Sequence, residues 1–288
     1  MPKPTILITG AGGQLAACIK DIVAHYSRFE FVFLSKAEMP VEDKAGVEAV
    51  FDRTRPQFCI NCAAYTAVDK AESEKESVFL INAQAVKDLA AVCAVRQTKL
   101  LHISTDYVFN GSSSVPYKES DPVDPINVYG ASKAEGEALT AAYAPDTIII
   151  RTSWLYSEHG HNFVKTMIRL MKEKETLNVV NDQTGSPTYG IDLAHAIMKI
   201  IDSDRWLPGI YHYCNEGRIS WYDFALAIKA LTGAGCMLHP VPAMAYPTPA
   251  KRPAYSLLDT SKIRESYGVN IPRWEDSLRT CIANLQGG

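Results

Sequence analysis

The sequence has little excess charge of either sign and no long hydrophobic run. Lys and Arg number 29 against 32 Asp and Glu over 288 residues, a formal net charge of −3. Nucleic-acid-binding proteins usually carry a basic excess, so no nucleic-acid partner is expected. The N-terminal run "MPKPTILITGAGGQL" is broken by glycines, and no apolar stretch reaches the length of a membrane span. We therefore expect a cytoplasmic protein without a membrane partner.

A disulfide framework is also lacking, because the seven cysteines are odd in number and scattered. Cys59 and Cys62 match C-x-x-C, but they lie in an apolar, strand-like run and no second such pair follows. We expect them to be buried structural thiols. The "HGH" pair, His159 and His161, has no partner cluster in the sequence, so no metal site is expected.

Apolar runs alternate with helical patterns through the first half of the chain. The run at residues 5–10 is β-branched and lacks polar alternation, which is typical of a central parallel strand. Alternation with short connections indicates right-handed βαβ units. The sequence therefore predicts an α/β fold with a Rossmann-like, doubly wound parallel sheet. Further strands are expected at residues 31–34, 58–63, 99–104 and 147–152, and helices after residue 10, at 45–53, at 77–95 and from 127.

A glycine-rich junction follows the first expected strand. Gly10, Gly13 and Ala16 form a G-x-x-G-x-x-A spacing. Glycine lets a pyrophosphate approach the backbone, and a helix N-terminus offers free N–H groups and a favourable dipole. An ordinary tight turn is the alternative, but the position in a βαβ series favours a dinucleotide. After the second strand, Ser35 and Lys36 replace the usual acidic residue, which mildly favours NADPH over NADH.

Tyr129 and Lys133 lie four residues apart in "NVYGASKAEGEAL" and share one face of an expected helix. A phenol with a pKa near 10 exchanges protons poorly at neutral pH, and a nearby ammonium should lower that pKa. Such a pair can protonate an oxyanion while a hydride reaches a carbonyl carbon. The alternative is a chance pair on a partly exposed helix.

These features together resemble the extended short-chain dehydrogenase/reductase family: a glycine-rich turn, "STD" after the fourth strand, then Y-x-x-x-K. The segments "TAVDKAESE", "STDYVFNG", "NVYGASKAEGE", "RTSWLY", "NDQTGSPT" and "YPTPAKRP" follow the order seen in dTDP-4-dehydrorhamnose reductases. With the glycine loop, the resemblance covers nearly the whole chain. It implies NAD(P)H-dependent reduction of the C4 ketone of dTDP-4-dehydro-L-rhamnose to dTDP-L-rhamnose.

The resemblance also implies roles for single residues. Tyr129 would be the proton donor, Lys133 would bind the nicotinamide ribose and tune the tyrosine, and Thr105 would contact the reacting oxygen. Substrate contacts are implied for Thr105, Asp106 and Trp154. Arg252 is a candidate for the substrate pyrophosphate because of its charge, with solvated surface charge as the alternative. Trp154 could instead be core and Asp106 a turn cap. With the glycine-loop and second-strand candidates included, the expected cofactor contacts are Gly10, Gly13, Gln14, Leu15, Ser35, Ala64, Tyr65, Thr66, Tyr129 and Lys133.

One departure concerns the adenosine end of the cofactor site. Pro40 stands where the family commonly has an acidic residue after the second strand, although Glu42 or Asp43 could replace it. The preference between NADPH and NADH therefore stays open. Lys165 and Arg169 are further candidates for the substrate pyrophosphate, with solvated surface charge as the alternative.

The pattern weakens after residue 150, and prolines cluster at residues 239–253. We expect an NAD(P)-binding domain at 1–150 and mainly a smaller substrate lobe at 151–288, with a helix near 191–201 returning to the core. Two other functions remain open: a reductase or epimerase of another nucleotide sugar, and a non-catalytic subunit resembling the regulatory β subunit of methionine adenosyltransferase. A homodimer also stays open.

Overall fold

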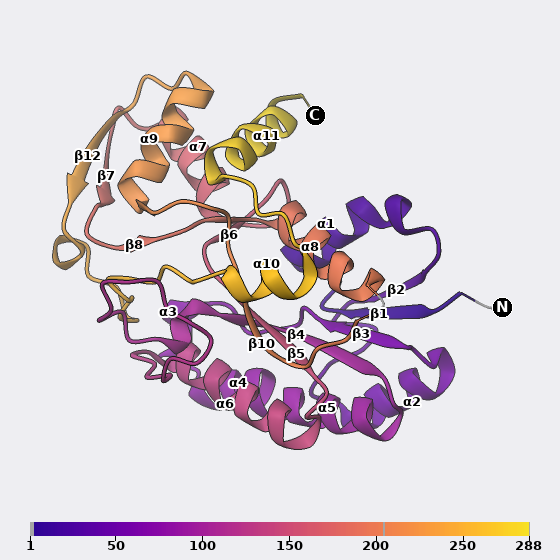
Figure 1. Cartoon of the computed structure of the whole chain (residues 1–288). Coiled ribbons are helices and arrows are strands. Elements are labelled where there is room, and N and C mark those ends of the chain that lie inside the picture. The colour runs from indigo at the N-terminus through magenta and orange to yellow at the C-terminus, as the bar shows by residue number, and fades with distance from the viewer. Residues whose placement is uncertain (1–2, 204, 288) are drawn as a thin grey trace.

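One six-stranded parallel sheet organises the chain (Figure 1), in the order β2–β1–β3–β4–β5–β10. The computed structural model describes residues 3–203 and 205–287. Because strand order reverses between β1 and β3, the carboxyl ends of these two strands form a topological switch point, where such folds bind ligands. The strands are β1 Thr5–Thr9, β2 Glu30–Leu34, β3 Phe58–Asn61, β4 Lys99–Thr105, β5 Ile148–Thr152 and β10 Gly209–Tyr213.

Helices cover both faces of this sheet, which confirms the predicted Rossmann-like fold (Figure 1). One face carries α1 (Gln14–Ile22), α8 (Gly190–Asp202) and α10 (Ser261–Tyr267), which share a hydrophobic core with the central strands. The other face carries α2 (Lys44–Thr54), α5 (Ala85–Val95) and α6 (Val128–Tyr143). The central strand β1 is buried along its whole length, as its apolar sequence requires.

The sixth strand, β10, was not predicted. Its sequence "GIYHY" carries one aliphatic residue, yet it pairs with β5 along its full length and buries Tyr211, His212 and Tyr213. A run so short and mixed has no strand-like periodicity. The segment is held as a strand by tertiary contacts: it pairs with β5, and Tyr267 of helix α10 packs edge-on against Tyr211.

The predicted helix at 77–95 is interrupted. It consists of α4 (Lys75–Phe79), a π-helical turn at Leu80–Gln84 and α5. Among the described residues, this run alone is long and apolar enough to cross a membrane by length and composition, and half of its most apolar window is buried within the fold. A buried core helix of a globular protein has the same character.

The remaining elements surround a second apolar core above the sheet in Figure 1. Its helices pack through aromatic and aliphatic side chains centred on Phe224. A capping box between Ser220 and Asp223 starts its central helix, α9. The elements are α7 (Phe163–Glu173), α9 (Trp221–Thr232), α11 (Trp274–Gly287) and the strand pairs β7 Thr176–Val180 with β12 Met237–Val241, β6 Leu155–Tyr156 with β9 Thr188–Tyr189, and β8 Thr184–Gly185 with β11 Ile219–Ser220.

Candidate active site

A first cavity, of about 550 Å³, opens at the switch point. Of the predicted cofactor residues, Gly10, Gly13, Ala64, Tyr65 and Thr66 line it. They come from the loops that follow β1 and β3, so the strand order itself brings them together. The other lining residues are Gly12, Lys36, Met39, Val41, Glu42, Cys62, Ala63, Ala67, Lys70, Glu74 and Ile81.

The glycine loop fits a dinucleotide pyrophosphate. Gly10 has φ +65°, and a Cβ there would lie 2.8 Å from the backbone nitrogen of Ala63. Gly13 caps α1 without any side-chain hydrogen bond, so the first N–H groups of the helix are left for a ligand. Leu15 can contribute only its main chain, because its side chain is buried in the core.

Gln14 also begins α1, but its side chain is engaged elsewhere. Its amide donates to the Leu155 carbonyl at 3.2 Å and accepts from Asn162 at 2.8 Å. These bonds join the glycine loop to the segment that follows β5. Any cofactor contact of Gln14 therefore falls to its main chain.

The loop after β2 differs from the expectation drawn from Ser35. The Ser35 hydroxyl and N–H both donate to the Glu38 carboxylate, at 2.7 and 2.8 Å, and Ser35 is not among the lining residues. Lys36 lines the cavity and pairs with Glu42 at 3.2 Å. Glu42 therefore brings a carboxylate to this cavity just after β2, although Pro40 occupies the position where the acidic residue was expected.

Tyr129, Thr105 and Asp106 lie together at the carboxyl end of β4. The Thr105 hydroxyl donates to Asp106 Oδ1 at 3.1 Å and accepts the Tyr107 N–H at 3.2 Å. Burial raises the pKa of Asp106 to about 7, and its Oδ2 has no hydrogen-bond partner. The predicted catalytic threonine and tyrosine lie close together, because Thr105 opposes part of the effect of burial on the pKa of the Tyr129 phenol.

The expectation that Lys133 lowers the pKa of Tyr129 was wrong for this structure. Burial raises the pKa of Tyr129 to about 12, and nearby Asp106 raises it further. The Lys133 amine instead donates to the Ile103 carbonyl at 2.6 Å and lies 3.2 Å from His102 Nε2. Burial lowers the pKa of Lys133 to about 8. The two residues share a helix face, but their polar ends do not meet.

The two glycines beside this pair let α6 approach its neighbours closely. A Cβ on Gly130 would collide with the Tyr107 carbonyl oxygen, and a Cβ on Gly136 would collide with that of Asn82. Asn82 lies in the π-helical turn and also bonds both the N–H and the carbonyl of Tyr65. The glycines thus place the Tyr–Lys helix against the end of β4 and against the loop that lines the first cavity.

A second cavity, of about 810 Å³, lies between the loops above β4 and the C-terminal elements. Arg252 lines it and donates to both Asp69 oxygens, at 3.1 and 2.8 Å. Tyr107 lines it too and meets the Tyr129 ring edge-on at 5.8 Å. The other lining residues are Asp69, Ile126, Phe163, Thr166, Met167, Leu170, Asn178, Val179, Val180, Gln183, Trp221, Ala243, Tyr246, Pro247, Thr248, Ala250 and Lys251.

Trp154 is not among these lining residues. It lies in a left-handed conformation, φ +46°, and stacks on Trp221 with ring centroids 3.5 Å apart. Trp221 therefore presents an aromatic face to the cavity, with Trp154 behind it. The sequence reasoning missed Trp221, although the S-x-x-D capping signature that starts its helix could have drawn attention to it.

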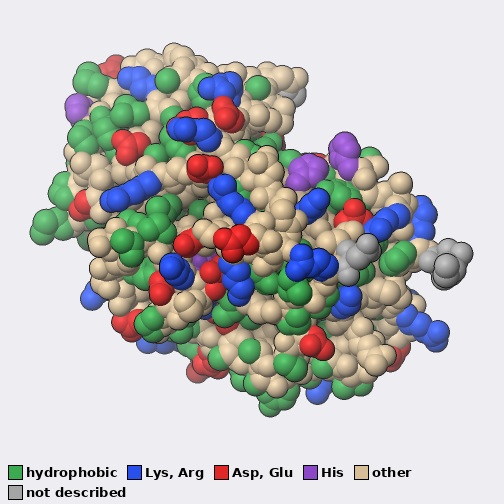
Figure 2. Space-filling view, in the orientation of Figure 1, with side chains coloured by type: hydrophobic (Ala, Val, Ile, Leu, Met, Phe, Trp, Pro, Cys, Tyr) green, Lys and Arg blue, Asp and Glu red, His purple; other side chains and the backbone are tan. Residues whose placement is uncertain are grey.

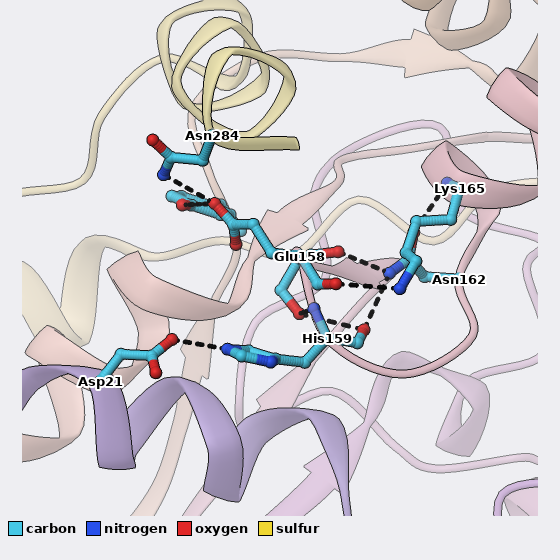
Figure 3. A network of polar contacts seen from close by, with 8 residues as sticks. Asp21, Glu158, His159, Asn162, Lys165 and Asn284 are labelled. Carbon is cyan, nitrogen blue, oxygen red and sulfur yellow. Dashed lines mark hydrogen bonds and ion pairs between the residues drawn. The ribbon is translucent and has the colours of Figure 1, made fainter. Parts of the chain in front are cut away.

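The loop after β6 holds several polar candidates in a network of its own (Figure 3). His159 pairs with Asp21 of α1 at 2.5 Å, and Lys165 donates to the Glu158 carbonyl at 2.9 Å. Arg169 pairs with Glu173 on the exposed side of α7. Neither basic residue lines the second cavity, which leaves Arg252 as the pyrophosphate candidate among the three.

The thiols and histidines form no metal cluster within residues 3–203 and 205–287, where no group of three or more potential ligands is found. Cys59 is buried and Cys62 lines the first cavity, and burial raises the pKa of the Cys62 thiol. A hydrogen bond with Cys93 and burial also raise the pKa of Cys59, so both thiols are protonated at neutral pH.

A doubly wound parallel sheet, a glycine loop at its switch point and a Tyr-x-x-x-Lys helix against the fourth strand define an oxidoreductase of the short-chain dehydrogenase/reductase class. Residues 4–287 match the family described as RmlD substrate binding domain. The dTDP-4-dehydrorhamnose reductase of Aggregatibacter actinomycetemcomitans is 43% identical, over 96% of this chain and 98% of the relative. This chain belongs to the dTDP-4-dehydrorhamnose reductase family.

Two further relatives bear on the ligands. A crystal structure of dTDP-4-dehydrorhamnose reductase from Bacillus anthracis in complex with NADP has a TM-score of 0.95 and 38% identity, and the match covers 98% of this chain and 100% of that one. A dTDP-4-keto-6-deoxy-D-glucose reductase of Streptomyces niveus is 38% identical over 94% of both chains.

Proposed function

We propose that this chain reduces the C4 ketone of dTDP-4-dehydro-L-rhamnose to dTDP-L-rhamnose, with NADPH or NADH as the hydride donor. The observation that carries the proposal is the position of Tyr129. Its ring abuts Tyr107 of the second cavity, while Asn82 joins α6 to Tyr65 of the first. A proton donor so placed serves a reaction between a ligand in each cavity.

The nicotinamide cofactor, when bound, supplies a hydride to the carbonyl carbon. The N–H groups at the start of α1 would hold its pyrophosphate, and the backbone of residues 64–66 would line its path. Lys36 is a candidate for the adenosine end, because it lines that part of the cavity.

At the reacting oxygen, the chain supplies the proton. The Thr105 hydroxyl donates to Asp106 in this structure and lies beside Tyr129, so it can turn to donate to the reacting oxygen. Tyr129 then gives its proton to the developing alkoxide as charge builds on that oxygen. With a pKa of about 12 the phenol is protonated at neutral pH, and it is still a stronger acid than the alcohol that the alkoxide becomes, so the transfer is downhill although slower than from a phenol with a lowered pKa.

The second cavity would hold the dTDP-sugar. Arg252 offers a charged donor to the pyrophosphate, and Asp69, which also lines this cavity, fixes its guanidinium. Trp221 and Phe163 give aromatic faces for the thymine or the deoxysugar. Trp154 supports Trp221 from behind. Asp106, protonated near neutrality, could donate to a sugar hydroxyl.

The test is nicotinamide oxidation, followed by absorbance, with dTDP-4-dehydro-L-rhamnose generated by preceding enzymes of its synthesis. Oxidation that requires both the ketosugar and Tyr129 supports the proposal, and NADPH and NADH run in parallel would rank the cofactors. The Streptomyces niveus relative makes dTDP-4-keto-6-deoxy-D-glucose the necessary second substrate. Faster turnover of that sugar would move the proposal to its reductase.

We also propose a domain organisation, a cellular location and the absence of a nucleic-acid partner. Residues 1–150 would carry the cofactor and 151–288 mainly the sugar nucleotide, with α8 and β10 packed into the first unit; the first cavity is lined wholly by residues 10–81. Seven free thiols support a reducing, cytoplasmic location. Interspersed acidic and basic side chains on the face in Figure 2 support the absence of a nucleic-acid partner. The expected lack of a membrane partner and the open homodimer stay predictions.

A further inference from the structure

Two helices that border different cavities are joined at their N-termini by a pair of side-chain amides. Gln14 is the first residue of α1, directly after the glycine loop of the first cavity, and Asn162 is the N-cap of α7. Asn162 Nδ2 lies 2.8 Å from Gln14 Oε1. The second cavity takes four of its lining residues from α7: Phe163, Thr166, Met167 and Leu170. The proposed function uses neither amide side chain.

The cap of α7 fixes the direction of each hydrogen bond in this link. Asn162 Oδ1 accepts the Lys165 N–H at 3.1 Å, so the Asn162 NH₂ group faces away from the helix. Figure 3 shows this NH₂ group directed at the backbone of the loop before α7, where it donates to the Ser157 carbonyl at 2.7 Å. It also donates to Gln14 Oε1, and Gln14 therefore presents its own NH₂ group to the Leu155 carbonyl, at 3.2 Å. Both amides are held in one orientation.

At the cofactor end, the link begins in backbone that a ligand can order. Gly12 and Gly13 precede Gln14, both are exposed, and a Cβ on Gly12 would meet no atom within 4 Å. A glycine main chain in open space has conformational freedom that a bound ligand removes. A pyrophosphate on the N–H groups at the start of α1 would therefore fix the main chain of Gln14, and with it the base of the side chain that reaches Asn162.

At the substrate end, the link reaches two aromatic rings of the second cavity. Phe163 follows Asn162 directly, lines the cavity and packs on Trp221, with ring centroids 4.7 Å apart. Val164, the next residue, is fully buried in the core of the C-terminal elements. The first turn of α7 therefore sets the position of both rings, and the Asn162 cap holds that turn.

We infer that Gln14 and Asn162 are positioning residues that couple the two cavities: cofactor binding at the glycine loop orders the first turn of α7 and so raises the affinity of the second cavity for the sugar nucleotide. The inference rests on the proposed function for the identity of the two ligands. Neither residue is among those that line either cavity, so each acts through its neighbours. A hydrogen-bonded link is worth roughly a two- to tenfold change in an equilibrium constant. By linkage, the sugar nucleotide raises the affinity for the cofactor by the same factor.

The test is the dissociation constant of dTDP, measured by isothermal titration calorimetry of the full chain with and without saturating NADP⁺. Because dTDP carries no sugar ring to meet the nicotinamide, a change in its affinity must pass through the protein. We expect NADP⁺ to tighten dTDP binding about fivefold, and the reverse titration to give the same factor. Equal dTDP affinities in the two conditions would overturn the inference alone. Failure of either ligand to bind would overturn the proposed function, and the inference with it.

Two variants break the link at its two ends. Gln14→Met keeps nearly the same shape but has no N–H to donate and only a weak acceptor, so the ratio of the two dTDP dissociation constants should fall to within about twofold of one. Asn162→Ser keeps a good N-cap residue but shortens the side chain, and it should lose the coupling as well. A wild-type ratio in Gln14→Met, or in Asn162→Ser should the first variant fail to fold, would overturn the inference.

The matched control is Asp21→Asn. The pair of Asp21 with His159 also joins α1 to the loop before α7, but it is partly exposed and Asp21 lies two turns along the helix from the glycine loop. The control should keep the wild-type ratio. Loss of the coupling there would show that any loosening of this loop suffices, which would overturn the assignment to Gln14 and Asn162.

Discussion

Helix α6 buries two ionisable side chains one turn apart, Lys133 and Glu137, and only Glu137 has a partner of opposite charge. Glu137 is bound by Arg151 through both carboxylate oxygens and by the Ser104 hydroxyl. Lys133 has only an imidazole and a carbonyl oxygen. At the end of β4, Asp106 also leaves one carboxylate oxygen without a hydrogen-bond partner. The ion pair of Glu137 with Arg151 satisfies both buried charges and serves the stability of the fold. Lys133 and Asp106 have no such counter-charge, and their pKa values are shifted, as is common for groups in active sites.

The largest effect, a loss of turnover, is expected at the active-site end of α6, where the buried groups have no ion-pair partner. Tyr129→Phe removes the proposed general acid, and turnover should fall by roughly 100- to 10,000-fold. The phenylalanine fills the same space, so the thermal unfolding midpoint should change little. Steady-state nicotinamide oxidation together with calorimetry would check both parts. Near-normal turnover in a folded variant would remove Tyr129 from the mechanism.

Loss of the Glu137–Arg151 ion pair should instead lower the free energy of unfolding. Glu137→Gln leaves the Arg151 guanidinium buried without its counter-charge, which should cost about 3–5 kcal/mol of unfolding free energy. Urea unfolding measures this loss. Glu135→Gln on the exposed side of the same helix is the matched control and should change stability by less than about 0.5 kcal/mol. Equal losses in the two variants would show that the buried pair is not special.

Asp106 gives the comparison a pH dependence. Its folded pKa of about 7 lies above the usual value near 3.9, so the folded state binds the proton more tightly. The resulting destabilisation is absent below about pH 4, grows as the pH rises, and is complete above pH 7 at about 4 kcal/mol. Asp106→Asn should therefore gain stability relative to the wild type at pH 8 but not at pH 4. A difference independent of pH would contradict the raised pKa.

The smallest effect is expected at the substrate cavity. Arg252→Ala removes one charge-assisted contact worth about 1.5–3 kcal/mol, so KM for the dTDP-sugar should rise roughly 10- to 150-fold with little change in kcat. Arg169→Ala, on the exposed side of α7, is the control and should leave KM unchanged. An unchanged KM in Arg252→Ala would exclude this residue from the pyrophosphate site.

Local sequence could predict the part of the fold in which each element carries its own signal. The five predicted strands read as apolar runs, and Asn127 and Asp43 cap α6 and α2 through their own side chains. β10 carries no such signal, because its burial depends on β5 and α10. The π-helical turn likewise follows from packing against α6 rather than from its own residues.

The candidate site was predictable to the same extent. The glycine loop and the residues after β3 meet because strand order brings them together, and the motifs named both. The side chains that face a cavity depend on loops far apart in sequence, which is why Trp221 was missed and Trp154 was expected in its place. The neutral polar residues next to Lys133 could not be predicted from the sequence either, because they lie on three different strands.

The most direct test of the reductase proposal is the fate of the hydride. NADPH and NADH, each carrying deuterium at the transferred position, would be incubated in separate reactions with dTDP-4-dehydro-L-rhamnose and this protein. The sugar nucleotide would then be analysed by mass spectrometry and NMR. The account predicts dTDP-L-rhamnose with one deuterium, on C4. Recovery of the unreduced ketosugar, or of product without deuterium at C4, would contradict it.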